Sequence, residues 1–205
     1  MRVHHQENSG WPGKPRNVGI DLARGDYVQF VDQDDELGPE TLERLYALAR
    51  RNGSDIVLGK LAGSMVGARR IFKRTVERTT IADSDVIDTL TGHKMFRREF
   101  LLANDIRFRE GYWRGEDLLF VARAYVRSGT ISILGDYPCY YWHRREDGGN
   151  NSKAPFELEG HYQRLREIIA TVAQATEPGE VQDRLLRRLP RRDDVSRRRN
   201  VHPQR

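Results

Sequence analysis

Three carboxylates lie within four residues at Asp32-Gln33-Asp34-Asp35, directly after an apolar run that ends at Val31. Like charges this close repel one another, and a hard cation neutralises them. Mg²⁺ or Mn²⁺ takes one or two protein carboxylates and completes its shell with substrate phosphates and water. The alternative is a solvated loop that caps the next helix, which we favour for an isolated Asp-rich tetrad. The apolar run shifts the balance toward a site, because open α/β sheets bind ligands beyond the carboxyl ends of their strands.

A second acidic pair, Glu116-Asp117, follows a Gly-Tyr-Trp-Arg-Gly loop and opens a predicted helix. The helix dipole favours carboxylates in a first turn, which is a purely structural explanation. A carboxylate beside aromatic residues is also suited to act as a general base. Tyr112 and Trp113 are able to pack against a sugar ring. Both explanations of the pair stay open at this point.

Several weaker candidates accompany the acidic clusters. The Gly/Pro-rich loop over residues 8–17 offers backbone N–H groups and Arg16 to a phosphate, or is an ordinary loop. His93 alone is more often a structural histidine, but its place after Gly92 at the start of a new element leaves a metal or phosphate role open. Arg144 and Arg145 begin a polar loop that holds an anionic acceptor or is solvated. Cys139 lies in an aromatic stretch that favours the core.

The elements that position these residues alternate between strands and helices. The pattern predicts strands over 26–32, 55–58, 130–134 and 138–143, and helices over 15–23, 39–52, 83–90, 116–128, 156–175 and 181–189. The first strand is apolar enough to be buried on both faces. Residues 60–82 lack a clear period and are predicted to form a hairpin or excursion. Strands that alternate with helices indicate an α/β fold.

Charge is distributed unevenly along the 205 residues. The net charge of +5 suggests an anionic partner at first sight. Residues 184–205, however, contain nine arginines and two aspartates, which leaves 26 basic and 28 acidic side chains before them. The body of the protein is therefore mildly acidic, and nucleic acid is not an expected partner. The single cysteine rules out an internal disulfide, and no apolar run is long enough to span a membrane.

The order of the motifs is more specific than any one of them. The stretch from Asn8-Ser9-Gly10 through Arg16-Asn17-Val18-Gly19-Ile20 to the strand before Asp32 resembles the family 2 glycosyltransferases of the GT-A fold. Four later segments also resemble that family, and particularly its bacterial members that build or decorate cell-surface polymers. They are Gly92-His93-Lys94-Met95-Phe96-Arg97-Arg98, Ile106-Arg107-Phe108, Glu116-Asp117-Leu118-Leu119-Phe120 and Pro138-Cys139-Tyr140-Tyr141. The resemblance covers roughly residues 3–155.

The resemblance implies a role for each matching residue. Asp32 would contact the ribose of a nucleotide-sugar donor, and Asp34 would bind the Mn²⁺ or Mg²⁺ that bridges its diphosphate. Asn8 and Arg16 would lie beside the nucleotide, with His93 as a further donor-site candidate. Asp117 would be the base that deprotonates the acceptor hydroxyl, while Glu116 orients acceptor or donor. One base without a covalent nucleophile implies inversion at the anomeric carbon. The implied acceptor is a glycan or a polyol-phosphate polymer.

The chain departs from the family pattern at its start. Family members begin with a strand, a helix and a second strand that bind the nucleotide base, and here Met1 falls just before the Asn-Ser-Gly loop. We therefore expect an N-terminally truncated GT-A domain, with an unpaired sheet edge beside the Asp32 strand. The expected organisation is a partial GT-A domain over 1–155, a helical segment over 156–189 and a basic, disordered tail over 190–205.

Two functional alternatives remain beside a glycosyltransferase whose activity the truncation impairs. The first is a non-catalytic remnant that binds a glycan or a protein through the aromatic residues and Arg144. The second concerns the tail, whose arginines attract nucleic acid or anionic lipid. The tail lacks interleaved aromatic residues, so we rank nucleic acid low and expect a cytoplasmic protein with peripheral contact to the inner face of the membrane.

Overall fold

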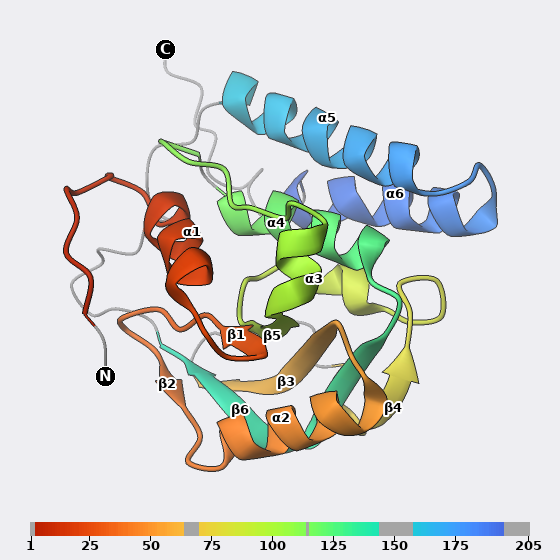
Figure 1. Ribbon diagram of the computed structural model, residues 1–205. Helices are drawn as coiled ribbons and strands as arrows, with labels where there is room; N and C mark the ends of the chain where they lie inside the picture. Colours follow the sequence, from red (N-terminus) through yellow and green to blue (C-terminus); the bar gives the residue numbers. More distant parts are fainter. Residues whose placement is uncertain (1–2, 64–69, 114, 144–157, 195–205) are drawn as a thin grey trace.

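A mixed sheet carries helices on both faces in the computed structural model, which describes residues 3–63, 70–113, 115–143 and 158–194 (Figure 1). The strands are β1 (Tyr27–Gln29), β2 (Glu36–Leu37), β3 (Ile56–Gly63), β4 (Val76–Thr79), β5 (Lys94–Arg97) and β6 (Ile131–Trp142). The helices are α1 (Gly13–Leu22), α2 (Thr41–Asn52), α3 (Arg98–Ala103), α4 (Glu116–Arg127), α5 (Leu158–Ala175) and α6 (Glu180–Asp194), with a 3-10 turn η1 (Val86–Asp88). This architecture confirms the predicted α/β class.

The strand order in the sheet is β1-β5-β3-β6-β2. The sixth strand, β4, pairs with β6 as well and is not part of this linear order. β3 and β6 are parallel, whereas β5 runs antiparallel to both β1 and β3. Within the described residues β1 pairs only with β5, so its other edge is open, as the sequence predicted. β1 is nevertheless shorter than expected, and its three residues are half-buried rather than buried on both faces. β1 is short because, in the described part of the chain, it forms hydrogen bonds with one neighbouring strand alone, and that pairing covers three residues.

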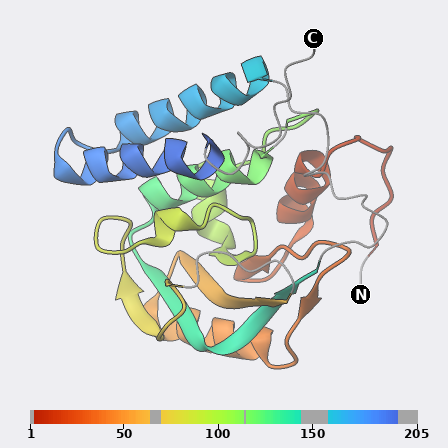
Figure 2. The ribbon, with the colours of Figure 1, turned by 180° about the vertical axis from the view of Figure 1, so that it is seen from behind.

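The core has two layers because successive strand residues point to opposite faces of the sheet. In β3, Ile56 and Leu58 join the larger cluster under α3 and α4, while Val57 faces α2. α2 covers one face alone, with Leu45 and Leu48 fully buried against the sheet. α1, α3 and α4 lie over the other face, and α5 and α6 pack outside α4 (Figures 1 and 2). The helical segment expected after residue 156 is therefore a second layer on that side.

One continuous strand replaces the two strands predicted over 130–134 and 138–143. β6 stays paired with β3 throughout, but the register shifts between Leu134, which faces Gly59, and Pro138, which faces Lys60. The three intervening residues of β6 are accommodated as an irregularity in the ladder. β6 is thus long enough to run from the core to the loop that carries Asp32.

Other elements differ from the sequence-based expectation at their boundaries. Only the 3-10 turn η1 forms where a helix over 83–90 was expected, and β5 and β2 were not predicted. α6 continues to Asp194, so the expected boundary at Leu189 and the disorder predicted from residue 190 are wrong for its last five residues. The remainder of the basic tail, 195–205, and the loop containing Arg144 and Arg145 lie outside the described residues.

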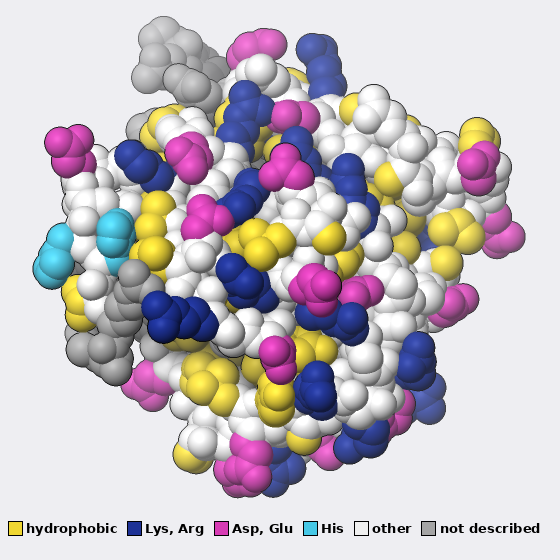
Figure 3. All heavy atoms as spheres, viewed as in Figure 1, with side chains coloured by type: hydrophobic (Ala, Val, Ile, Leu, Met, Phe, Trp, Pro, Cys, Tyr) yellow, Lys and Arg dark blue, Asp and Glu magenta, His cyan; other side chains and the backbone are white. Residues whose placement is uncertain are grey.

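The surface shows no large patch of one charge in the view of Figure 3. Basic and acidic side chains are interspersed over this face, in keeping with the nearly balanced charge of the body of the chain. No helix in the described part of the chain has the length and apolar character needed to cross a membrane.

Candidate active site

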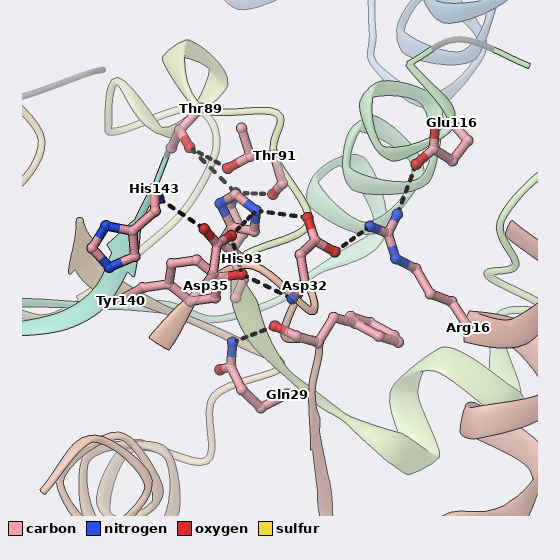
Figure 4. A network of polar contacts seen from close by, with 12 residues as sticks. Arg16, Gln29, Asp32, Asp35, Thr89, Thr91, His93, Glu116, Tyr140 and His143 are labelled. Atoms are coloured by element: carbon pink, nitrogen blue, oxygen red, sulfur yellow. Dashed lines mark hydrogen bonds and ion pairs between the residues drawn. The ribbon is translucent and has the colours of Figure 1, made fainter. Parts of the chain in front are cut away.

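The acidic loop after β1 is fixed by the far end of β6. The Tyr140 hydroxyl accepts a hydrogen bond from the Asp32 backbone N–H at 3.1 Å and donates one to Asp35 Oδ2 at 2.8 Å. The other Asp35 oxygen accepts from the His143 backbone N–H at 2.8 Å (Figure 4). The Asp35 side chain is 1% exposed. Asp35 therefore holds the loop against β6, and both of its oxygens are used for this.

His93 lies immediately before β5, with its ring stacked on Tyr140 at a centroid distance of 4.2 Å. Its Nε2 atom is 3.5 Å from Asp32 Oδ2 and 4.0 Å from Asp35 Oδ2. Its Nδ1 atom is buried and has no hydrogen-bond partner in the described part of the chain. The ring is thus held in place mainly by stacking, with one nitrogen directed at the carboxylates.

Arg16 joins the acidic loop to the start of α4. Its Nη2 donates to Asp32 Oδ1 and its Nη1 to Glu116 Oε1, both at 2.7 Å. Burial raises the pKa of Asp32, but the hydrogen bond from His93 and the charge of Arg16 outweigh it and lower this pKa to about 2. The indole Nε1 of Trp11 donates to the second Glu116 oxygen at 3.0 Å. Asp32 and Glu116, 84 positions apart in the sequence, therefore share one guanidinium (Figure 4).

Local contacts of α1 explain why Arg16 lies here. The side-chain amide of Asn17 accepts from the Phe108 backbone N–H and donates to the Phe108 carbonyl, both at 2.9 Å. Gly13 lies so close to Arg109 that a Cβ there would be 2.1 Å from the Arg109 carbonyl oxygen. These contacts fasten the first turns of α1 to the loop before α4. Arg16, next to Asn17, is thereby directed between Asp32 and Glu116.

Glu116 and Asp117 occupy the first turn of α4, which follows Gly115 in the left-handed region at φ 77°. Burial raises the pKa of Glu116, and repulsion from Asp117 adds to this, while Arg16 and Trp11 act in the opposite direction. Burial likewise raises the pKa of Asp117, against the charges of Arg16, His93 and Lys94. A carboxylate with a raised pKa binds a proton more readily, which suits a general base.

The loop offers ligands that fit a divalent cation. Asp32, Asp35 and His93 each present one atom within 4.8 Å of the others, but those carboxylates are already engaged by protein donors. Asp34 is partly exposed, and no hydrogen bond or ion pair joins its side chain to another described residue. Carboxylate oxygens are ligands that suit Mn²⁺ or Mg²⁺. Asp34 is therefore the carboxylate of this loop with oxygens free for an ion.

The structure brings most of the predicted site residues together. Arg16, Asp32, His93 and Glu116 form one connected set, and Asp117 lies beside it. Asn8 does not join them, because its side-chain oxygen accepts from the Gly10 backbone N–H within an exposed turn.

Two residues of the network, Trp11 and Tyr140, were given no role from the sequence, and Asp35 was considered only as a member of the acidic tetrad. A buried tryptophan or tyrosine usually finds a partner for its polar atom, which is a signal, but the sequence does not name the partner.

A family model and curated relatives both match this chain to glycosyltransferases. The model of the family described as "Glycosyl transferase family 2" matches residues 2–117. A poly(ribitol-phosphate) beta-glucosyltransferase of Bacillus spizizenii is 38% identical over 83% of this chain and 27% of its own length. The poly(ribitol-phosphate) beta-N-acetylglucosaminyltransferase TarS of Staphylococcus aureus is 37% identical over 88% of this chain and 32% of its own length. The chain thus spans about a third or less of these two curated relatives.

A solved structure supports the same relationship. The crystal structure of residues 1–349 of S. aureus TarS with UDP-GlcNAc superposes with a TM-score of 0.84 at 37% identity. The match covers 90% of this chain and 54% of that one. This confirms the expected GT-A type of fold and the resemblance to transferases of bacterial cell-surface polymers. The chain belongs to glycosyl transferase family 2.

Proposed function

We propose that this chain transfers a sugar from a uridine-diphosphate sugar to a hydroxyl of a poly(ribitol-phosphate) type of cell-wall polymer. The observation that carries the proposal is the guanidinium of Arg16, which joins Asp32 of the acidic loop to Glu116 at the start of α4. Donor-side and acceptor-side carboxylates are thereby held in one site. The two poly(ribitol-phosphate) glycosyltransferases compared above, and the TarS structure with UDP-GlcNAc, suggest the acceptor and donor classes.

The donor side of the site is formed by the acidic loop and its neighbours. In this proposal Asp34 binds Mn²⁺ or Mg²⁺, and Asp32 contacts the ribose. A bound divalent cation would stabilise the negative charge that builds on the departing diphosphate. Arg16 and His93 face the nucleotide, where Arg16 contributes a fixed positive charge that needs no reorganisation during the reaction. Asn8, which the described network does not include, stays a donor-site prediction of the sequence alone.

The acceptor side is formed by the first turn of α4. Asp117 takes the proton from the attacking hydroxyl, a role supported by its partly buried position and raised pKa. Glu116 orients the substrate, since its oxygens are fixed by Arg16 and Trp11. Attack by the acceptor on the face opposite the leaving diphosphate inverts the anomeric carbon. A non-catalytic chain that only binds glycans is the less favoured alternative. Glycan binding alone would not require Asp32 and Glu116 to be paired with the same arginine.

The proposal also covers the location of the reaction. We place it in the cytoplasm, where nucleotide sugars are made, with the polymer presented at the inner face of the membrane. Peripheral contact through the arginine-rich tail, residues 190–205, remains a prediction of the sequence.

A transfer assay tests the proposal. The chain is incubated with UDP-GlcNAc or UDP-glucose, a synthetic ribitol-phosphate oligomer and Mn²⁺, and the product is analysed by mass spectrometry and NMR. We expect a product with an inverted anomeric carbon, loss of product with chelator, and loss of product in Asp117→Asn. The control is Asp136→Asn, since Asp136 is exposed on β6 away from the site. Product formation by Asp117→Asn at the unmodified rate, or a retained configuration, would contradict the proposal.

A further inference from the structure

The described residues at the start of the loop before α4 are fastened to two helices. Asn17 pairs with both backbone groups of Phe108, and Gly13 packs against the Arg109 carbonyl. The Arg109 side chain donates to both oxygens of Glu167 on α5, at 2.9 and 2.7 Å. The segment that leads to Glu116 is therefore held by α1 on one side and by α5 on the other.

The two aromatic residues of this loop have different environments. Trp113 is covered by cations, with the Arg109 guanidinium carbon 3.7 Å and the Arg164 guanidinium carbon 5.9 Å from the ring centroid. Tyr112 is 63% exposed and touches Trp11, with the two ring centroids 4.8 Å apart and their planes inclined at 58°. Trp113 thus holds the loop to α5, whereas Tyr112 presents an aromatic face to solvent from a fixed backbone.

Trp11 connects this aromatic face to the candidate active site. It is 8% exposed, and its indole N–H donates to Glu116. The contacts run in the order His93, Asp32, Arg16, Glu116, Trp11 and Tyr112. Tyr112 therefore lies at the end of the network opposite to His93 and the acidic loop, on the side of Glu116.

We propose that Tyr112, backed by Trp11, is an acceptor subsite that takes the C–H surface of a neutral sugar or polyol unit. The inference rests on the proposed function and deepens it. An exposed aromatic ring on a fixed loop binds C–H surfaces at little cost in conformational entropy. The carboxylate of Glu116 behind Trp11 disfavours a phosphate directly over this ring, so a neutral unit is the better fit. The phosphates of a polyol-phosphate acceptor would then lie to either side of this unit.

Binding measurements on the full chain test the subsite. The probe is a synthetic ribitol-phosphate oligomer, titrated by calorimetry into the unmodified chain, Tyr112→Ala, Tyr112→Phe and Tyr46→Ala. Tyr46 is the matched control, because it is 43% exposed and lies on α2 at the other face of the sheet. UDP-GlcNAc with Mn²⁺ is titrated separately into each protein, and circular dichroism checks that each variant is folded.

We expect Tyr112→Ala to bind the oligomer about tenfold more weakly, which is the loss of one good aromatic contact. Tyr112→Phe and Tyr46→Ala should bind it as the unmodified chain does, and the defect of Tyr112→Ala should persist at about 0.5 M NaCl because the contact is not ionic. Equal oligomer affinity of Tyr112→Ala and Tyr46→Ala, a defect that disappears in salt, or no oligomer binding at all would overturn the subsite. Failure of every protein to bind UDP-GlcNAc would instead contradict the proposed function.

Discussion

Replacing Arg16 by methionine should destabilise the fold through the carboxylates it leaves behind. Arg16 is 17% exposed and is bonded to Glu116, whose side chain is 9% exposed, and to Asp32, whose side chain is 37% exposed. Methionine keeps much of the packing volume but supplies no charge. Glu116 would then remain in a buried position, where its donors among the described residues are the indole N–H of Trp11 and its own backbone.

The expected size of the effect follows from these exposures. Removing one partner of a buried ion pair costs about 3–5 kcal/mol, whereas exposed pairs are worth roughly 0–1 kcal/mol. The Glu116 contact belongs near the lower end of the buried range, and the Asp32 contact is largely screened. We expect a loss of about 3 kcal/mol in the free energy of unfolding, which lowers the Tm of a chain this long by roughly 6–12 °C.

The pH dependence separates charge from packing. The low pKa of Asp32 stabilises the fold above its unfolded value of about 4, and this contribution is lost as the pH falls through about 2. Glu116 has a raised pKa, which would rise further without Arg16, so the variant suffers most where this carboxyl is ionised and recovers as it becomes protonated. The Asp32 contribution is still largely present at pH 4, so it is the protonation of Glu116 that makes the deficit larger at pH 7 than at pH 4.

Urea unfolding followed by circular dichroism at these two pH values measures the deficit. Arg16→Met combined with Glu116→Gln should recover at least half of it, because the uncompensated carboxylate is gone. Arg44→Met is the control, since Arg44 pairs with Glu40 on the exposed side of α2, and it should leave the midpoint unchanged. A deficit below about 1 kcal/mol, or one that is equal at both pH values, would refute the electrostatic reasoning.

Further predictions concern the acidic loop and the thiol. Asp34→Asn should abolish Mn²⁺-dependent binding of UDP-GlcNAc without changing the Tm, whereas Asp35→Asn should lower the Tm; the opposite pattern would exchange their roles. Tyr140→Phe should cost roughly 1–3 kcal/mol in urea unfolding, because its hydroxyl satisfies both Asp35 and the Asp32 N–H; an unchanged midpoint would show that the loop is held otherwise. Burial raises the pKa of Cys139 to about 11, so the folded chain should react with a thiol reagent at pH 8 only after urea is added.

The sequence predicted the elements whose pattern is regular. α2 and α4 were expected within about two residues of their observed bounds, because each combines an apolar face with helix-favouring residues. α2 ends at Gly53, whose φ of 60° lies in the left-handed region that glycine adopts readily at a helix end. β2 and β5 were missed because they are short and owe their conformation to pairing with β6 and with β1 and β3. Propensity carries little information about strands of two to four residues.

The sequence predicted which residues belong to the site better than it predicted the contacts between them. The motif order identified Arg16, Asp32 and Glu116, but nothing in their spacing shows that one guanidinium bridges the two carboxylates. That contact depends on how Asn17 fastens α1 to the loop around Phe108. Long-range pairing of this kind is set by tertiary packing, which a single sequence does not display.

The proposed mechanism depends on Asp34 binding the metal and Asp117 acting as the base. Equilibrium binding of UDP-GlcNAc with and without Mn²⁺ separates these two roles. The measurement compares the unmodified chain with Asp34→Asn and Asp117→Asn. We expect Mn²⁺-dependent binding to the unmodified chain, its loss in Asp34→Asn, and nearly unchanged affinity in Asp117→Asn, which nevertheless transfers no sugar. Binding that does not depend on Mn²⁺, or that disappears in Asp117→Asn while Asp34→Asn retains it, would show that these two carboxylates do not have the roles proposed for them.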